Sequence, residues 1–262
     1  MRAMGLLFSV LVGFGLCTSS ALADASGKAL GVDQNARAET RDGVKQLTVG
    51  ADLFIGDRVV TDARGLVQIR FSDSTRLVVG PNSSLVLEDY LLREDGSGGK
   101  LAVNALSGTF RFITGGAPKD RYLIQTPTGT IGVRGTALEM KGDRRGFSTI
   151  VLHGSIVICN LANKCVTLED VCDVGVVNVS DATIVGNSRE MTQGEREQLR
   201  AMFPWVTNDG RLLGPFRVVE GRECFNRPVV TNTPGSEGAE SNDTPPSENR
   251  GLTNGDYNIT EP

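Results

Sequence analysis

The stretch of sequence that decides the fold is LVQIRFSDSTRLVVGPNSSLVL, residues 66–87. Apolar and polar side chains alternate along 66–71, and a short apolar run at 77–79 follows four polar turn residues. Gly80-Pro81 then interrupts the chain before a third run at 85–87. Strands of about five residues, with a turn signal every eight to twelve, are typical of sandwiches, barrels and β-solenoids. This stretch therefore predicts an all-β fold.

The same pattern continues outward, from about Ala29 to Val179. Glycine supplies 32 of the 262 residues, well above a usual share of roughly 7%, and this fits frequent turns. No apolar stripe of helical period persists here beyond two turns. Further short strands are predicted at 101–103, 108–112, 122–125, 137–140, 148–152 and 155–158.

One helix is predicted after the strands, over 192–203. Thr192 and Glu195 have the spacing of a capping box, in which each side chain bonds the other residue's backbone N–H. Leu199 and Met202 lie on one face of this helix, and a proline ends it. We expect the apolar face to pack on the β body; binding a partner is the alternative.

The first 23 residues have the pattern of a secretory signal peptide. Arg2 gives a positive start, an apolar run of eleven residues begins at Leu6, and Ala21-Leu22-Ala23 is a small-x-small cleavage site. The run is too short to span a membrane, which takes about 20 residues; a retained membrane anchor is the alternative. We expect cleavage after Ala23, no membrane span afterwards, and a protein of the periplasm or cell surface or one that is secreted.

The last segment, 229–262, contains one base and six acids and is rich in Pro, Gly, Ser and Asn. Such a composition cannot bury enough apolar surface to offset its ordering entropy, so a disordered acidic tail is predicted, with a docking segment as the alternative. Without the tail and signal peptide, the chain has 25 basic residues (27 less Arg2 and Arg250) and 25 acidic residues (31 less the six of the tail). This neutral body gives no reason to expect a nucleic acid as partner.

Several strings, in this order, resemble the FecR-type domain, named for the ferric-citrate signalling regulator. They are Gly56-Asp57, GLVQIRFSDSTRL (65–77), Pro81-Asn82-Ser83, Gly108-Thr109-Phe110, TPTGTIGVRGT (126–136) and LHGSIV (152–157). The resemblance covers roughly residues 45–160. One departure is Asp73-Ser74-Thr75, where the family more often has Asp-Gly-Ser or Asp-Gly-Thr. The resemblance implies a curved, all-β, solenoid-like or jelly-roll-like domain in the periplasm or at the cell surface.

Better-known members of that family also carry a cytoplasmic anti-sigma segment and one membrane span, and their periplasmic domain contacts an outer-membrane transporter. This sequence shows neither of the first two, so we do not expect it to regulate a sigma factor itself. The expected organisation is a signal peptide (1–23), a lead-in (24–44), a FecR-type β domain (45–180), an extension with a short helix (181–228) and the tail (229–262).

The glycines of the resembling string, Gly129, Gly132 and Gly135, recur every three residues. Neither G-x-G-x-x-G nor the Gly-Lys-Ser/Thr end of a P-loop is present, so we interpret them as structural residues of tight β turns, as we do Asp73. Arg134, between two of these glycines, is a candidate for binding an anion, although an ion pair or a carbonyl cap is the favoured interpretation.

The sequence offers few candidate catalytic residues. His153 is the only histidine, and we expect it at a turn between two strands. No serine lies in G-x-S-x-G, and the acidic pairs lack the spacing of a calcium loop or a glycosidase site. We therefore predict no enzyme activity, no cofactor and no metal.

Four cysteines remain after signal cleavage, an even number that suggests two disulfides in an exported protein. Cys159 and Cys165 flank a five-residue connection that reads as a hairpin loop, which predicts a Cys159–Cys165 bridge. Cys172 is then left with Cys224. A four-thiolate zinc site is the disfavoured alternative because no C-x-x-C pair occurs.

The function predicted from these features is a non-enzymatic exported β domain that binds an as yet unidentified envelope protein or glycan, with a role in signalling as one possibility. The alternatives are an envelope-polymer hydrolase and a purely structural component of a surface assembly. An exposed aromatic patch would favour binding over the structural role. Phe203, Trp205 and Phe216 are the candidates for it, although we expect them in the core.

Overall fold

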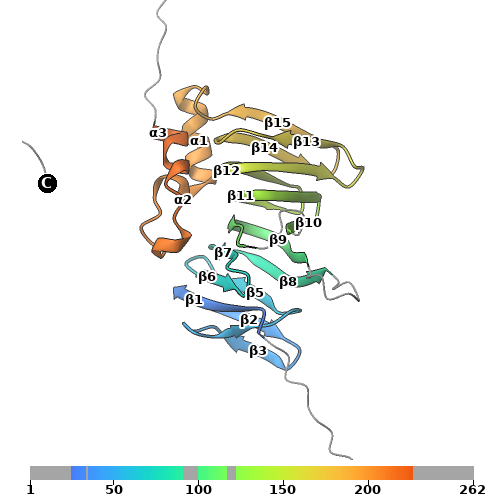
Figure 1. Ribbon diagram of the computed structural model, residues 1–262, viewed down its shortest axis with the longest axis vertical. Coiled ribbons are helices and arrows are strands. Elements are labelled where there is room, and N and C mark those ends of the chain that lie inside the picture. Colours follow the sequence, from blue (N-terminus) through green and yellow to red (C-terminus); the bar gives the residue numbers. More distant parts are fainter. Residues whose placement is uncertain (1–24, 34, 91–99, 117–121, 227–262) are drawn as a thin grey trace, which may run out of the picture. The chain divides into compact units, whose positions relative to one another are not determined.

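The computed structural model describes residues 25–226 except 34, 91–99 and 117–121 (Figure 1). The predicted signal peptide and acidic tail lie outside the described residues. Within the described part, no helix is long and apolar enough to cross a membrane.

The described chain is mostly β-strand, with helical segments only after the last strand. The strands are β1 (Gly27–Asp33), β2 (Ala36–Thr40), β3 (Gly43–Gln46), β4 (Asp52–Leu53), β5 (Arg58–Thr61), β6 (Leu66–Phe71), β7 (Arg76–Val79), β8 (Ser84–Tyr90), β9 (Lys100–Ile113), β10 (Tyr122–Thr126), β11 (Gly129–Asp143), β12 (Gly146–Asn160), β13 (Cys165–Leu168), β14 (Asp173–Asn178) and β15 (Ala182–Asn187). The helical segments are α1 (Gln193–Met202), α2 (Pro204–Thr207), η2 (Gly214–Phe216), η3 (Glu220–Arg222) and α3 (Glu223–Asn226).

Strand β6 has the bounds that the alternation at 66–71 predicts. Elsewhere, strands predicted as separate are continuous: the runs 101–103 and 108–112 both lie in β9, and those on either side of Gly154 form β12. Gly108 has φ 122° and Gly154 has φ 71°. A glycine at positive φ bends a strand without ending its ladder, so these signals are bulges within strands.

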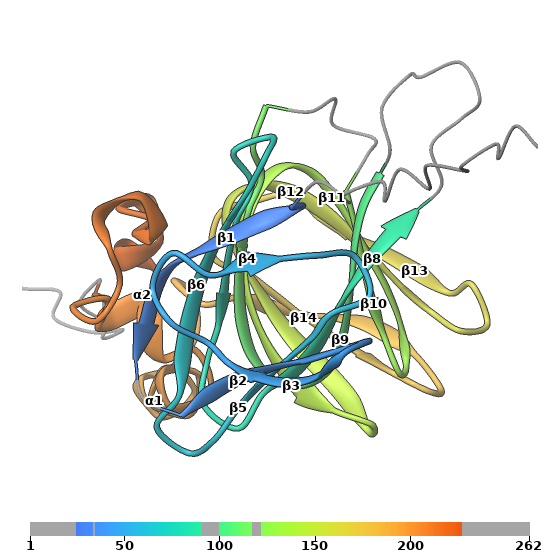
Figure 2. The ribbon, with the colours of Figure 1, turned by 90° about the horizontal axis from the view of Figure 1, so that it is seen from below.

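The strands form one sheet in the order β15-β14-β12-β11-β10-β9-β7-β6-β1-β4, with β2, β3, β5, β8 and β13 joined to it at the side. The pairings described are antiparallel except that of β9 with β10. Strands β11 and β12 form its longest hairpin, from Gly129 opposite Asn160 to Asp143 opposite Gly146. Figure 2 shows the strands around a common interior, with the helices outside.

The sheet begins earlier than the predicted FecR-type domain. Strand β1 pairs with β6, and β2 pairs with β5, so most of the stretch 24–44 is part of the sheet rather than a lead-in to it. Likewise, β15 extends the sheet beyond 180, into the predicted extension.

The main core fills the interior between the strands, with side chains such as Ile69, Leu77 and Phe112 almost completely buried. A second apolar layer lies on the outer side, where Leu199 and Phe203 pack with Ile150 and Leu152 of β12. Strand β6 is also covered on its outer face, where Leu66 packs with Trp205 and Phe216, and five of its six residues are buried. This burial on both faces explains why it carries more apolar side chains than strict alternation requires.

The helical extension thus packs on the β body, as predicted. Thr192 and Glu195 form the predicted capping box at the start of α1. Phe203, Trp205 and Phe216 are buried, with exposed fractions of 0%, 5% and 0%. The core interpretation of these three rings is therefore confirmed, and they form no exposed aromatic patch.

Candidate functional site

The tip of the β11–β12 hairpin has the sequence KGDRRG, residues 141–146. Asp143 and Gly146 are the last paired residues, so Arg144 and Arg145 make the turn. The Asp143 carboxylate accepts the Arg145 backbone N–H at 2.8 Å and its Nη2–H at 2.9 Å. These hydrogen bonds hold the pKa of Asp143 below its ordinary value, and the one from the Arg145 side chain has the larger effect. The tip is therefore fixed by its own carboxylate.

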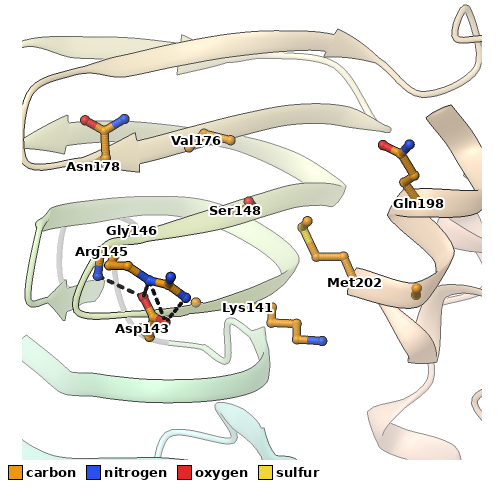
Figure 3. A pocket seen from close by; sticks show the side chains of 11 residues that line it. Lys141, Asp143, Arg145, Gly146, Ser148, Val176, Asn178, Gln198 and Met202 are labelled. Atoms are coloured by element: carbon orange, nitrogen blue, oxygen red, sulfur yellow. Dashed lines mark hydrogen bonds and ion pairs between the residues drawn. The ribbon is translucent and has the colours of Figure 1, made fainter.

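One hollow lies between this tip and helix α1 (Figure 3). It has a volume of about 560 Å³. Lys141 of β11, Ser148 of β12 and Val176 of β14 line it from the sheet, and Gln198 and Met202 line it from α1. Lys141, Ser148 and Val176 occupy opposed positions on three adjacent strands, so the floor is a row across the sheet.

A second hollow, also of about 560 Å³, shares Asp143 and Arg145 with the first. Its lining adds Arg58 of β5, the facing pair Ser84 and Ser107 of β8 and β9, and Arg144. We call the two hollows together the hairpin groove. It runs across β5, β8, β9, β11, β12 and β14 rather than along any strand.

The hairpin groove is positively charged. Lys141 and Arg144 are exposed, and neither forms an ion pair within the described part of the chain. Arg145, with 92% of its side chain exposed, is paired with Asp143, and Arg58 lies 3.7 Å from a Glu39 carboxylate oxygen. Two cations thus remain uncompensated, although residues 24–228 as a whole are neutral.

Among the described residues, no serine hydroxyl of the groove is hydrogen-bonded to Lys141 or to another basic group. Its described lining has no His or Cys, and its one carboxylate is engaged by Arg145. Across the described residues, no group of three His, Cys, Asp or Glu side chains could hold a metal. What the arrangement can do is bind an anion.

His153 lies elsewhere. It was expected at a turn but lies within β12, opposite Ala137 at a bulge. Its Nδ1 is 2.6 Å from a Glu220 carboxylate oxygen, and 58% of its side chain is exposed. This pair links β12 to η3.

The three glycines lie in strand β11 rather than in a turn. A Cβ at Gly129 would lie 2.0 Å from the carbonyl oxygen of Cys159, and Gly135 has φ 66° at the bulge opposite β12. At Gly132, the nearest atom to an added Cβ is the Val157 carbonyl oxygen at 3.8 Å, so neither close packing nor backbone conformation requires a glycine there.

Asp73 organises the β6–β7 turn. Its carboxylate accepts the Thr75 N–H at 2.9 Å, the Thr75 hydroxyl at 2.7 Å and the Tyr122 hydroxyl at 2.8 Å. Ser74 beside it has φ 70°, in the left-handed region that favours glycine. The turn thus needs Asp73, and it holds Ser74 in a strained conformation.

Within the described residues, Arg134 does not form the ion pair or carbonyl cap that the sequence favoured. Its side chain is exposed, and no described residue makes an ion pair or hydrogen bond with it. Arg134 also lies outside the lining of the hairpin groove. The alternative, that it binds an anion, stays a proposal.

Both predicted disulfides are present, Cys159–Cys165 and Cys172–Cys224. The first joins facing residues of β12 and β13. The second closes a sequence separation of 52 and ties the segment before β14 to helix α3. Disulfides persist in oxidising compartments, which fits a protein outside the cytoplasm.

A buried ion pair escaped the sequence analysis. Arg111 of β9 and Glu139 of β11 face each other in the sheet and are both 0% exposed. Glu139 accepts Nη2–H of Arg111 at 2.7 Å and the Trp205 N–H at 3.2 Å. Burial raises the pKa of the Glu139 carboxyl, while Arg111 acts in the opposite direction.

This pair fastens the extension to the sheet, since Arg111 also donates to the carbonyl oxygen of Phe216. It therefore contributes to holding α1, one wall of the hairpin groove, against β12 and β14. The only sequence signal was a charge on each of two strands, and nothing local says that they face each other.

The family described as FecR protein matches residues 57–157. The chain carries a FecR domain. The matched part runs from just before β5 into β12, and it includes the hairpin tip with Arg144 and Arg145. A comparison with curated proteins found no match.

Two crystal structures of a candidate anti-sigma factor from Parabacteroides distasonis ATCC 8503, at 2.50 and 1.65 Å resolution, are similar to part of the chain. Each shares 14% sequence identity with a TM-score of 0.38, over 53% of this chain. The chain matches 64% of the length of those structures.

Proposed function

We propose that residues 25–226 form a non-enzymatic recognition module of the bacterial envelope, which binds a protein or glycan in the hairpin groove. The observation that carries this proposal is the groove itself, whose described lining combines uncompensated cations with no histidine, no cysteine and no carboxylate other than Asp143, which is paired with Arg145. A fixed site of this kind can hold a ligand without transforming it.

The envelope location is supported by the two disulfides and by the signal-peptide pattern of residues 1–23. The FecR domain supports a place in envelope signalling. In this proposal the strands coil as a solenoid-like stack, which gives the groove a rigid floor.

A hydrolase is the rival function. Its strongest candidate residue is His153, which has Glu220 beside it. The hydroxyls of Thr114 and Thr136 line the same hollow, but they donate to backbone carbonyl oxygens rather than to His153. A purely structural role is the second rival, and the groove argues against it because a structural part needs no unpaired cations in a hollow.

The test is capture of envelope components by the purified mature chain and by its groove variant R144Q/R145Q. We expect the parent protein to retain a component that the groove variant loses. R70Q is the matched control, because Arg70 is an exposed arginine of β6 outside the groove.

Equal capture by all three proteins would contradict the proposal. So would degradation of the captured component by the parent protein that His153→Ala abolishes, since that result would establish an enzyme.

A further inference from the structure

We infer that the hairpin groove takes a linear anionic glycan, a polysaccharide with carboxylate groups along its chain, lying across the strands. This inference rests on the proposed function, and it names the ligand class of that same groove.

The length and direction of the groove suit an extended polymer. From Arg58 on β5 it crosses β8, β9, β11 and β12 to Val176 on β14. Neighbouring strands lie about 4.8 Å apart, so five strand intervals give a track of roughly 24 Å. A track of this length holds several units of a chain rather than one small molecule.

Hydroxyl groups lie along this track. Ser84, Ser107 and Ser148 come from three different strands, and no described residue makes a hydrogen bond with their hydroxyls. Asn178 accepts backbone N–H groups through Oδ1, and its amide nitrogen makes no hydrogen bond within the described residues. Such groups both donate to and accept from the hydroxyls of a sugar.

The charges add the second element of recognition. Arg144 at the hairpin tip and Lys141 on β11 line the track without an acidic partner among the described residues, and Arg58 lies at its far end. Guanidinium groups bind carboxylates through paired hydrogen bonds. Cations spaced along a row of hydroxyls match a polymer that alternates hydroxyls and carboxylates.

Two other ligand classes fit less well. An extended peptide commonly binds by adding a strand to a free sheet edge, but β9, β11, β12 and β14 are each paired on both sides. A neutral glycan is commonly held by stacking on aromatic rings, and the described lining of the groove contains none.

The experiment is a titration of the mature protein with polygalacturonate, a polymer of uronic acid, with dextran as the neutral control. We expect binding of polygalacturonate, which added salt weakens, and no binding of dextran. R144Q/R145Q should weaken the binding by about tenfold or more, as the loss of two charge-assisted contacts implies, and R70Q should not change it.

The substitution Asp143→Asn should change the affinity for polygalacturonate in the opposite direction. Its side-chain oxygen can still accept the Arg145 N–H, as Asp143 does, but the negative charge in the groove is gone. We expect tighter binding of polygalacturonate, and weaker binding would contradict the inference.

The inference is overturned if polygalacturonate does not bind, if R144Q/R145Q binds it as well as the parent protein does, or if poly-L-glutamate binds equally well. If any of these results accompanies envelope capture that still depends on Arg144 and Arg145, the ligand class is wrong and the proposed function stands. If capture is independent of these arginines, the proposed function itself fails.

Discussion

Glu139 is the residue whose replacement should cost the most stability. In Glu139→Gln, the Arg111 guanidinium stays buried at 0% exposure and loses its charged partner. Breaking a buried ion pair from one side costs roughly 3–5 kcal/mol, so we expect a loss of that size in urea-induced unfolding. A change below about 1 kcal/mol, the scale of an exposed pair, would contradict this account of the extension.

Ser74 offers a gain in stability at the same scale. Its φ of 70° is left-handed, a conformation that costs a non-glycine residue about 1–2 kcal/mol. The Asp73 bonds to Thr75 do not involve the Ser74 side chain. Ser74→Gly should therefore raise the unfolding free energy by up to about 1 kcal/mol, because the flexibility of glycine in the unfolded chain offsets part of the relief.

Asn163 gives the matched comparison for that prediction. It also has positive φ, 58°, but asparagine tolerates this region better than serine. Asn163→Gly should change the melting temperature less than Ser74→Gly does. A larger gain at Asn163, or a loss at Ser74, would show that strain is not what distinguishes the two turns.

At the scale of elements, helix α1 depends on its first turn. Two hydrogen bonds from Thr192 hold the pKa of Glu195 below the ordinary value of 4.5, and the bond from the Thr192 hydroxyl has a larger effect than the one from its backbone N–H. The stabilisation from Glu195 is therefore complete above about pH 4.5 and is lost as the pH falls through the lower folded-state pKa.

Melting temperatures of the parent protein and Glu195→Gln between pH 6 and 3 measure this effect. Glutamine keeps an oxygen for the capping box but does not titrate. We expect the gap in melting temperature in favour of the parent protein to narrow as the pH falls. A constant gap over this range would show that the Glu195 charge does not stabilise the helix.

Local sequence patterns predict individual elements well. Alternation gives β6 its bounds, and the spacing of Thr192 and Glu195 gives the start of α1. The same patterns misplace breaks between 103 and 108 and at Gly154, because a glycine signals positive φ equally in a turn and in a bulge. Only pairing with a neighbouring strand decides between the two.

The candidate site is harder to predict from the sequence than the individual elements are. Arg58 and Arg144 line the same hollow although 85 residues separate them, and their meeting depends on the order in which β5, β8, β9 and β11 lie beside one another. The anion-binding candidate visible in the sequence was instead Arg134, because it stands between glycines of a recognisable string.

At the scale of the whole described body, the two disulfides should differ in effect. The loop-entropy relation gives about 4 kcal/mol for a closed loop of 52 residues and about 2 kcal/mol for one of 6. The longer bridge also fastens the extension that covers the outer layer of the core. Replacing Cys172 and Cys224 by serine should therefore lower the melting temperature more than replacing Cys159 and Cys165.

Reduction of both bridges should lower the melting temperature at least as much as the loss of the longer one alone. An unchanged melt after complete reduction, or a larger effect of the Cys159–Cys165 replacement, would contradict the role given to Cys172–Cys224. Calorimetry of the oxidised, reduced and serine-substituted proteins makes the comparison.

Site-specific photo-cross-linking in intact envelopes tests most directly whether the hairpin groove is a recognition site. A photoreactive residue replaces Ser148 on the groove floor, and the same residue at Arg70 on β6 is the control. The account predicts an adduct with an envelope component from position 148 that R144Q/R145Q abolishes, and no such adduct from position 70. An adduct from position 70 alone, or one from position 148 that survives R144Q/R145Q, would contradict it.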